Sequence, residues 1–376
     1  MPGLYVHIPF CARRCPYCDF AVSTNARADF RGSYVAALQK ELATALGETN
    51  LEFETVFFGG GTPTELPAAT LNHILASVLP HAAPDAEISL EANPENLDLE
   101  FLKALRAGGW NRLSLGAQSF DEGELSVLGR RHDANRIENV VRDAKLAGFE
   151  NISLDLIYGA PRTSLGSWRT TLRRAIELDV THISAYSLTI EEGTAFDLAV
   201  ARGDMGAPDD DFGGELMDEA AKLLGEAGFE RYEVSNWART GFRSRHNANY
   251  WRGGNYLGVG CGAHSHFDGH RFWNERDAKV YVKTIQNHGT ARAGEEWLTP
   301  RERAVELVAL GVRCRDGFSL EEVSQTGAFD AHAALKRQLS TLLASGALRE
   351  ECERIVPGAQ GFAIADGLAA RLVGQF

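Results

Sequence analysis

The sequence predicts an α/β protein: a partial (β/α)6 barrel of parallel strands followed by a winged-helix-like helical module. Two observations support the barrel. From Leu4 to about Ile190, short β-rich runs alternate with longer segments of helical period. Glycine and polar residues also recur where those runs end, which is where parallel barrels carry their functional residues. The alternation indicates parallel strands because each crossover must return the chain to its starting edge.

Each unit of the predicted barrel pairs a β-rich run with an amphipathic segment. The predicted strands are LYVHIPF (4–10), TVFFGG (55–60), EISLEAN (87–93), RLSLGAQS (112–119), NISLDLIYG (151–159) and HISAYSLTI (182–190). The first five are followed by predicted helices over 34–46, 70–79, 99–107, 134–146 and 168–178. Six such units are enough for an open barrel.

The alternation weakens after about residue 208, so we predict three domains, over 1–208, 209–298 and 299–376. The middle region combines a helix (212–227) and the run YEVSNWA with a tract over 246–267. That tract is rich in glycine and aromatic residues, and we expect loops and short strands that extend the sheet. The last region predicts helices over 301–310, 319–326 and 331–345, typical of a winged-helix-like module.

The overall charge excludes some classes of partner. The 376 residues contain 38 Lys and Arg against 51 Asp and Glu, for a net charge of −13. This charge disfavours nucleic acid, so we expect the last module to serve in packing. No stretch approaches the roughly 18 apolar residues of a membrane helix, and the N-terminus lacks a signal-peptide pattern. We expect a cytoplasmic protein that is not integral to the membrane; a transient membrane association stays open.

Three of the six cysteines, Cys11, Cys15 and Cys18, fall within eight positions. Six cysteines are too few for a disulfide scaffold, so a tight cluster indicates metal or redox chemistry. Three thiolates can ligate three irons of a cubane cluster and leave the fourth iron open to a small molecule. A structural zinc site with His7 as its fourth ligand is the alternative. The isolated Cys261, Cys314 and Cys352 are expected to be small buried residues.

The motifs together resemble those of one family. C-x3-C-x2-C after a first strand, with Tyr17 before the last cysteine, is similar to the radical S-adenosylmethionine superfamily. The wider set resembles its branch that contains oxygen-independent coproporphyrinogen III oxidase and the haem chaperone HemW: YVHIPFCARRCPYCDF, FFGGGTPT, EANPE, LSLGAQSF, LGRRH, DLIYGAP, YSLTIEEGT and HNANYW. The resemblance runs from about residue 4 to the end of the chain.

The resemblance implies a [4Fe–4S] cluster on Cys11, Cys15 and Cys18 and S-adenosylmethionine on the open iron. It implies that the glycine run ending in Thr62 holds the methionyl moiety, because glycines allow close backbone approach. Arginine suits a carboxylate, whereas acidic residues suit a sulfonium, an amine and ribose hydroxyls. The residues implied to surround S-adenosylmethionine are Tyr5, Tyr17, Gly60, Gly61, Thr62, Glu91, Gln118, Arg130 and Asp155, with Tyr186 for packing on the adenine.

Two positions favour the chaperone within this branch. Oxidase-like members carry a cysteine where this sequence has Phe20, and they carry an N-terminal extension that this sequence lacks. The run HNANYW fits the H-N-x-x-Y-W motif of the chaperone. A neutral imidazole is a common axial ligand of haem iron, so His246 is the expected haem contact. His264, His266 and His270 are alternatives.

The resemblance therefore implies a haem chaperone that transfers haem to acceptor proteins such as respiratory enzymes, with an electron donor for its cluster. The alternative is an enzyme that oxidatively decarboxylates coproporphyrinogen III by radical chemistry. A third hypothesis is an electron-transfer protein, which is weaker because a closed cluster needs a fourth ligand. Whether the protein is an enzyme stays open at this stage.

Overall fold

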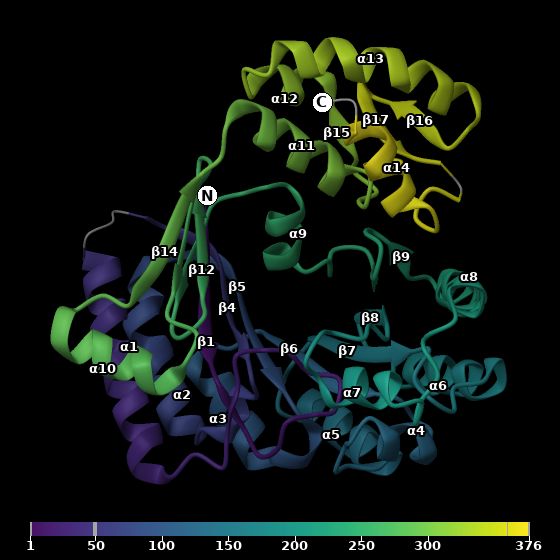
Figure 1. Cartoon of the computed structure of the whole chain (residues 1–376). Coiled ribbons are helices and arrows are strands. Elements are labelled where there is room, and N and C mark those ends of the chain that lie inside the picture. Colours follow the sequence, from purple (N-terminus) through teal and green to yellow (C-terminus); the bar gives the residue numbers. More distant parts are fainter. Residues whose placement is uncertain (1, 48–50, 359, 375–376) are drawn as a thin grey trace.

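The computed structural model describes residues 2–47, 51–358 and 360–374. Within these residues the chain forms a twelve-stranded sheet, a three-stranded sheet near the C-terminus and a two-stranded ladder. Figure 1 shows the large sheet as a curved layer, with helices on its outer side and the C-terminal region at one end. The small ladder joins β2 (Phe10–Cys11) to β3 (Ser23–Thr24).

The centre of the large sheet contains six strands that lie side by side in chain order and run parallel. They are β1 (Gly3–Ile8), β4 (Phe53–Gly60), β5 (Ala82–Ala92), β6 (Arg112–Gln118), β7 (Asn151–Tyr158) and β8 (His182–Ser187). Each matches a predicted strand, with shifts at the ends. The predicted fold class, an open parallel barrel, is confirmed.

Helices connect these strands on the outer side of the sheet (Figure 1). They are α1 (Ala28–Gly47), α2 (Ala68–Val78), α3 (Leu99–Gly108), α4 (Glu122–Val127), α5 (Ala134–Leu146) and α6 (Leu165–Glu177), with 3-10 turns at 63–65, 79–81 and 94–96. Capping side chains fix where several of them begin. Asp98 accepts a hydrogen bond from the Phe101 N–H, and Asp133 accepts one from the Arg136 N–H. Such caps satisfy backbone donors that the first helical turn leaves unpaired.

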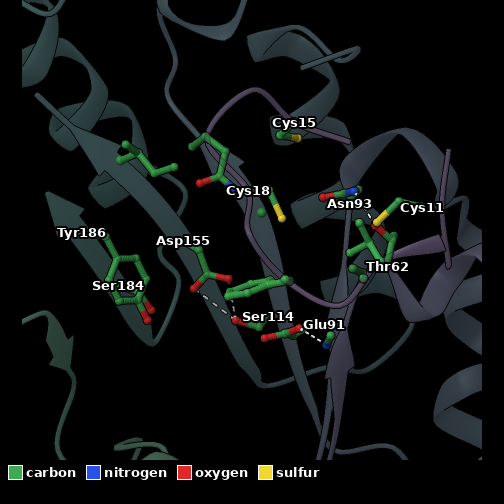
Figure 2. Close-up of a pocket in the computed structure, with 18 of the residues that line it drawn as sticks. Cys11, Cys15, Cys18, Thr62, Glu91, Asn93, Ser114, Asp155, Ser184 and Tyr186 are labelled. Carbon is green, nitrogen blue, oxygen red and sulfur yellow. Dashed lines mark hydrogen bonds between the residues drawn. The ribbon is translucent and has the colours of Figure 1, made fainter. Parts of the chain in front are cut away.

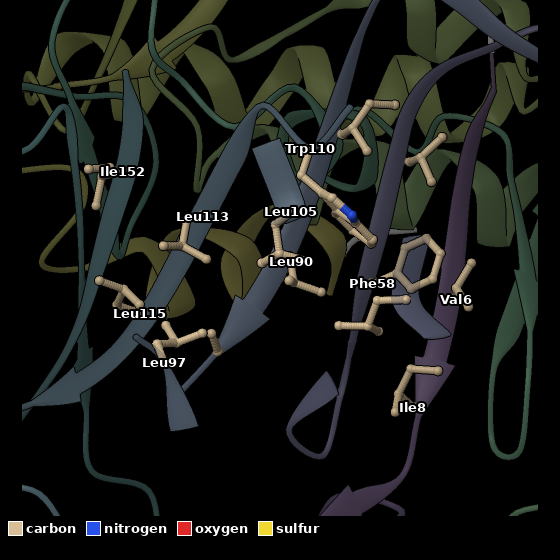
Figure 3. Packing of buried hydrophobic residues seen from close by; sticks show 14 of the residues in the cluster. Val6, Ile8, Phe58, Leu90, Leu97, Leu105, Trp110, Leu113, Leu115 and Ile152 are labelled. Carbon is tan, nitrogen blue, oxygen red and sulfur yellow. The ribbon is translucent and has the colours of Figure 1, made fainter. Parts of the chain in front are cut away.

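The hydrophobic core lies between the barrel strands and the helices (Figure 3). Successive strand residues point to opposite faces, so the apolar set faces the helices while the intervening residues face the interior. Val6, Phe58 and Leu113 are fully buried on the helix side. Trp110 packs edge-on against Phe58, with ring centroids 4.7 Å apart. The interior face is therefore left to polar and aromatic side chains, which build the site.

The sheet continues beyond both edges of the barrel. Beyond β1 lie the parallel β11 (Tyr256–Val259) and then three antiparallel strands, β12 (His264–Phe267), β13 (His270–Asn274) and β14 (Arg292–Trp297). Beyond β8 lie the short antiparallel strands β10 (Asn236–Ala238) and β9 (Glu230–Arg231). The helices of this region are α7 (Ala195–Ala201), α8 (Asp210–Glu226), α9 (Arg245–Trp251) and α10 (Ala278–His288).

Helix α9 corrects the prediction for the tract over 246–267. The first six residues of this tract, HNANYW, are helical and do not form a loop, whereas β11 and β12 form as expected. Ser244 caps the helix by accepting a hydrogen bond from the Asn247 N–H. Two helical turns are too short to show a hydrophobic period, so only the cap marked this helix in the sequence.

The C-terminal region has a hydrophobic cluster of its own, which includes Val308, Phe318, Leu339 and Leu372. Its elements are α11 (Pro300–Gly311), β15 (Phe318–Ser319), α12 (Leu320–Gln325), α13 (Phe329–Ala344), β16 (Leu348–Glu351), β17 (Arg354–Pro357) and α14 (Ala365–Val373). Helices beside a small antiparallel sheet form the winged-helix-like arrangement that was predicted. The division of the whole chain at residues 208 and 298 stays a prediction.

Two further predictions concern the membrane and the lone cysteines. In the described part of the chain, no helix is long and apolar enough to cross a membrane. Cys261 and Cys314 are buried, as predicted. Cys352 is exposed, so the prediction for it was wrong. It has a φ of 49° in the turn between β16 and β17, where there is no core to pack against.

Candidate functional site

A cavity of about 650 Å³ opens at the carboxyl ends of the barrel strands. The structure brings every predicted site residue to its lining: Tyr5, Cys11, Cys15, Tyr17, Cys18, Gly60, Gly61, Thr62, Glu91, Gln118, Arg130, Asp155, Tyr186 and His246. These residues come from segments far apart in the sequence, and parallel strands bring them together because their carboxyl ends meet at one edge. The role of each residue stays a prediction.

Cys11 ends β2, Cys15 and Cys18 lie on the loop that connects β2 to β3, and all three are partly buried. Local bonds shape this loop, because the Cys18 N–H donates to the Cys15 carbonyl and Arg14 Nη2 donates to the Phe20 carbonyl. The sulfurs also contact the barrel. Arg130 Nη1 lies 3.7 Å from the Cys15 sulfur, and Thr62 Oγ1 lies 3.6 Å from the Cys11 sulfur.

The arrangement of the three thiols fits a multi-iron cluster. Within the described residues, no group of three or more His, Cys, Asp or Glu side chains is placed to bind one metal ion. Figure 2 shows the three sulfurs spread along the cavity wall. A cubane takes each thiolate on a different iron, so its ligands need not converge on a single point. A structural zinc site, the alternative from the sequence, requires four ligands that do converge.

The glycine run at the end of β4 brings backbone close to the cavity. Gly60 has a φ of 110°, and a Cβ there would lie 2.4 Å from an atom of the His7 ring. A Cβ on Gly61 would lie 2.7 Å from the Phe10 carbonyl oxygen. Only glycine fits these two positions without displacing neighbours. The run therefore forms a cradle of exposed backbone groups beside the cysteine loop.

Two partly buried carboxyl groups, Glu91 on β5 and Asp155 on β7, lie in the same cavity (Figure 2). Burial and then the charge of Asp155 raise the pKa of Glu91 to about 7, while a hydrogen bond from the Gly60 N–H acts in the opposite direction. Burial also raises the pKa of Asp155, whose oxygens accept hydrogen bonds of 2.9 and 3.2 Å from Ser114 Oγ. Among the described residues neither carboxyl group has a salt bridge to a basic side chain. Such a pair suits a cationic ligand.

Arg130 connects the cysteine loop to the barrel. Its Nη2 donates to the Gly116 carbonyl at 2.8 Å and to the Asn93 side-chain oxygen, and Asn93 in turn donates to Thr62 Oγ1 at 2.9 Å. Neither Asn93 nor Ser114 was predicted as a site residue. Both are polar residues within predicted barrel strands. That position could have indicated that they belong to the site.

Three further predicted residues occupy distinct places on the wall. Gln118 has a φ of 66° at a bulge where β6 ends, and a non-glycine residue in that region is strained by roughly 1–3 kcal/mol. Such strain is typical of functional sites. Tyr186 on β8 is 41% exposed, which leaves its ring accessible to a flat ligand. Tyr17 packs against Phe196 near the cysteine loop.

His246, the expected haem contact, has both ring nitrogens within hydrogen-bond distance of other side chains. Its Nδ1 lies 2.8 Å from Thr55 Oγ1, and its Nε2 lies 2.8 Å from the Tyr250 phenol oxygen. The ring stacks on Phe57 with centroids 5.0 Å apart, and burial lowers the pKa of His246 to about 3. In this conformation both ring nitrogens are already hydrogen-bonded within the protein. Iron ligation by His246 would require one of these bonds to break.

Comparisons with known proteins place the chain in a family. The family described as the Radical SAM superfamily matches residues 5–175, and the HemN C-terminal domain matches residues 298–364. A protein called "Heme chaperone HemW" from Mycobacterium tuberculosis is 37% identical, with 99% of this chain and 95% of that protein covered. The mouse "Radical S-adenosyl methionine domain-containing protein 1, mitochondrial" is 35% identical, with 99% and 87% covered.

One solved structure supports the same assignment at the level of the fold. Coproporphyrinogen III oxidase (HemN) from Escherichia coli superposes with a TM-score of 0.84 at 24% identity, covering 100% of this chain and 91% of that one. Membership in the superfamily implies a [4Fe–4S] cluster and S-adenosylmethionine. The strand order, the cysteine loop and these similarities lead to one conclusion: the chain belongs to the radical SAM superfamily, within its group of HemW-like proteins.

Proposed function

We propose that this protein is a haem chaperone, which binds haem and passes it to acceptor proteins. The observation that carries the proposal is the 37% identity, over nearly the full length of both chains, to proteins called heme chaperone. Phe20, at the position where oxidase-like members carry a cysteine, is 60% exposed beside the cavity. The acceptors that we propose are haem-requiring respiratory enzymes, loaded in the cytoplasm, with an electron donor for the cluster.

We propose further that Cys11, Cys15 and Cys18 hold a [4Fe–4S] cluster whose fourth iron takes S-adenosylmethionine. When bound, such a cluster supplies single electrons at a potential set by its surroundings. Arg130 lies against the Cys15 sulfur and stabilises negative charge at this end of the cavity. Thr62 and the glycine cradle present backbone and hydroxyl groups to the methionyl moiety.

The carboxyl groups of Glu91 and Asp155 support this ligand. S-adenosylmethionine carries a sulfonium and an ammonium group, and a cation that enters the cavity offsets the cost of burying negative charge on Glu91 and Asp155. Tyr186, with its exposed ring, offers a surface on which the adenine packs. The cavity volume of about 650 Å³ lies within the roughly 300–1,000 Å³ of small-molecule and cofactor sites.

The cluster assignment is tested by anaerobic reconstitution of the full chain. Serine in place of Cys11, Cys15 or Cys18 should abolish the bound iron and sulfide and the visible absorbance of the cluster. Cys352→Ser is the matched control, because this exposed thiol lies in the turn between β16 and β17 of the C-terminal region, and its loss should leave the iron content unchanged. Full iron content in all three cavity variants would reject the assignment.

The chaperone assignment is tested with the same preparation. We expect it to bind haem, and to transfer that haem to an apo-form of a respiratory haem protein. Conversion of coproporphyrinogen III to protoporphyrinogen IX should not occur. Turnover of the porphyrinogen without haem transfer would reject the chaperone function in favour of the oxidase function, which is the alternative that the sequence left open.

A further inference from the structure

A second cavity, of about 860 Å³, adjoins the first. Its volume also lies within the roughly 300–1,000 Å³ of cofactor sites. The two cavities share part of their walls, namely Tyr5, Asp19, Phe20, Gly60, Glu91 and Tyr250. The second extends along β11, β12 and β13 to α11, whose Glu306 and Leu310 close it on the side of the C-terminal region. A bound molecule there would lie next to the cysteine loop.

Strand register determines which side chains reach this cavity. His264 and His266 are two residues apart on β12, so they share one face of the sheet. Across the ladder they pair with Trp273 and Arg271 of β13. The imidazole of His264 stacks on the Trp273 indole, with ring centroids 5.7 Å apart and an angle of 25° between the planes. All four side chains line the cavity.

His264 differs from the other histidines of the two cavities. His7, His182, His246 and His266 each use both ring nitrogens in hydrogen bonds. The ring nitrogens of His264 form no hydrogen bond with any part of the chain that the structure describes. Burial and the nearby Arg271 lower the pKa of His264. A neutral imidazole with a free ring nitrogen is the form of histidine that ligates metal ions.

The remaining walls combine aromatic surface and two arginines with the acidic side chains of Asp19, Glu91, Glu275 and Glu306. Trp273, Tyr256 and the exposed ring of Phe20 offer aromatic surface. The Arg276 side chain is 68% exposed at the cavity; its Nη2 donates to the Asp19 carbonyl and lies 4.0 Å from the Asp19 carboxylate, which leaves its other N–H groups without a partner among the described residues. A guanidinium of this kind can take a carboxylate in bidentate fashion. Arg271 is already paired with Glu296 and Glu306, so it is less available.

We propose that haem binds in this second cavity with His264 as the axial ligand of its iron, the porphyrin against Phe20 and the edge of Trp273, and a propionate on Arg276. The inference rests on the proposed chaperone function, because that function supplies haem as the ligand. It moves the iron ligand from His246 to His264. It also places haem beside Phe20, two residues after Cys18, so that cluster and haem share one loop.

The test is a titration of the reconstituted full chain with haem, followed through the Soret absorbance. Replacing His264 with glycine should weaken haem binding at least about tenfold. Loss of a residue that only hydrogen-bonds to a metal ligand already costs about 10–100-fold in affinity, and loss of the ligand itself should cost no less. The Soret band should also shift, and added imidazole should restore the band of the unaltered protein. A purely structural role for His264 would not give this rescue. His264→Gln, which keeps a side chain on β12, should show the same loss.

His270→Ala is the matched control. His270 is on the neighbouring strand, but it pairs with Glu295, stacks on Trp297 and lines another cavity. This variant should bind haem like the unaltered protein. Iron content and circular dichroism verify that each variant is folded.

The outcomes separate the inference from the function on which it rests. If the unaltered protein binds no haem, the chaperone proposal and this inference fail together. If it binds haem and both His264 variants keep its affinity and spectrum, only the inference fails. Loss of haem in His246→Gln alone would return the iron ligand to His246.

Discussion

The Nε2 atom of His246 lies 2.8 Å from the phenol oxygen of Tyr250, one helical turn further along α9. Together with Thr55 on the other side, Tyr250 completes the hydrogen bonding of a histidine that is only 1% exposed. The H-N-x-x-Y-W motif is therefore a structural unit in this conformation: its histidine and tyrosine form one hydrogen bond, and its helix is fixed to β4 through Thr55.

Replacing Tyr250 with phenylalanine tests this relationship. The imidazole would lose a partner while it stays buried, so we expect the free energy of unfolding to fall by about 1–3 kcal/mol in urea titrations. Tyr256→Phe is the control, because its phenol forms no hydrogen bond among the described residues. Haem affinity should not change in Tyr250→Phe if His264 is the ligand. Tighter haem binding would instead indicate that the freed His246 nitrogen ligates the iron.

The raised pKa of Glu91 predicts a pH-dependent affinity for S-adenosylmethionine. Below about pH 7 this carboxyl group is protonated in the free protein, and a cationic ligand must displace the proton. We expect binding about tenfold weaker at pH 6 than at pH 8, measured anaerobically by calorimetry. Glu91→Gln should bind more weakly at pH 8 and lose this part of the pH dependence. Equal slopes in the two proteins would show that Glu91 does not contact the ligand charge.

Gly60 should not tolerate a side chain. Alanine there would combine a φ of 110° with a clash against the His7 ring, so we expect a loss of stability of at least about 1–3 kcal/mol and loss of S-adenosylmethionine binding. Gly32→Ala is the matched control. It lies within α1 with nothing within 4 Å of the added Cβ, and should stabilise the protein by up to about 1 kcal/mol. Urea unfolding and ligand titration measure both effects. Normal binding of S-adenosylmethionine by Gly60→Ala would show that the glycine cradle does not contact this ligand.

Glu233 predicts a pH-dependent stability. This carboxyl group is fully buried, and burial raises its pKa from 4.5 to about 7. The folded protein therefore keeps a proton that the unfolded chain loses above pH 4.5. The contribution of Glu233 to the free energy of unfolding is therefore fully present below pH 4.5 and is lost as the pH rises through 7. The change in the free energy of unfolding is on the order of 3 kcal/mol. In Glu233→Gln this loss should disappear, so the variant should gain stability relative to the unaltered protein between pH 5 and pH 8. Parallel pH profiles would contradict the assignment.

The sequence determined the barrel because its signals are local. A parallel strand buried on one face shows its apolar residues directly, and the helix between two strands shows its own period. The ends of those strands also marked the site, since any parallel barrel brings its strand ends to one edge. For the same reason the positions of Cys11, Glu91 and Asp155 in one cavity followed from their positions in the sequence.

Only the tertiary structure decided which histidine is available to an iron. His246 and His264 look alike in the sequence, each beside aromatic residues. Hydrogen bonds with Thr55, on a strand 191 residues away, and with Tyr250 occupy the first, whereas the second faces an open cavity and forms no ring hydrogen bond within the described part of the chain. Such a difference depends on contacts between distant segments and on the register of β12 against β13, and neither is encoded in the period or spacing of the residues themselves.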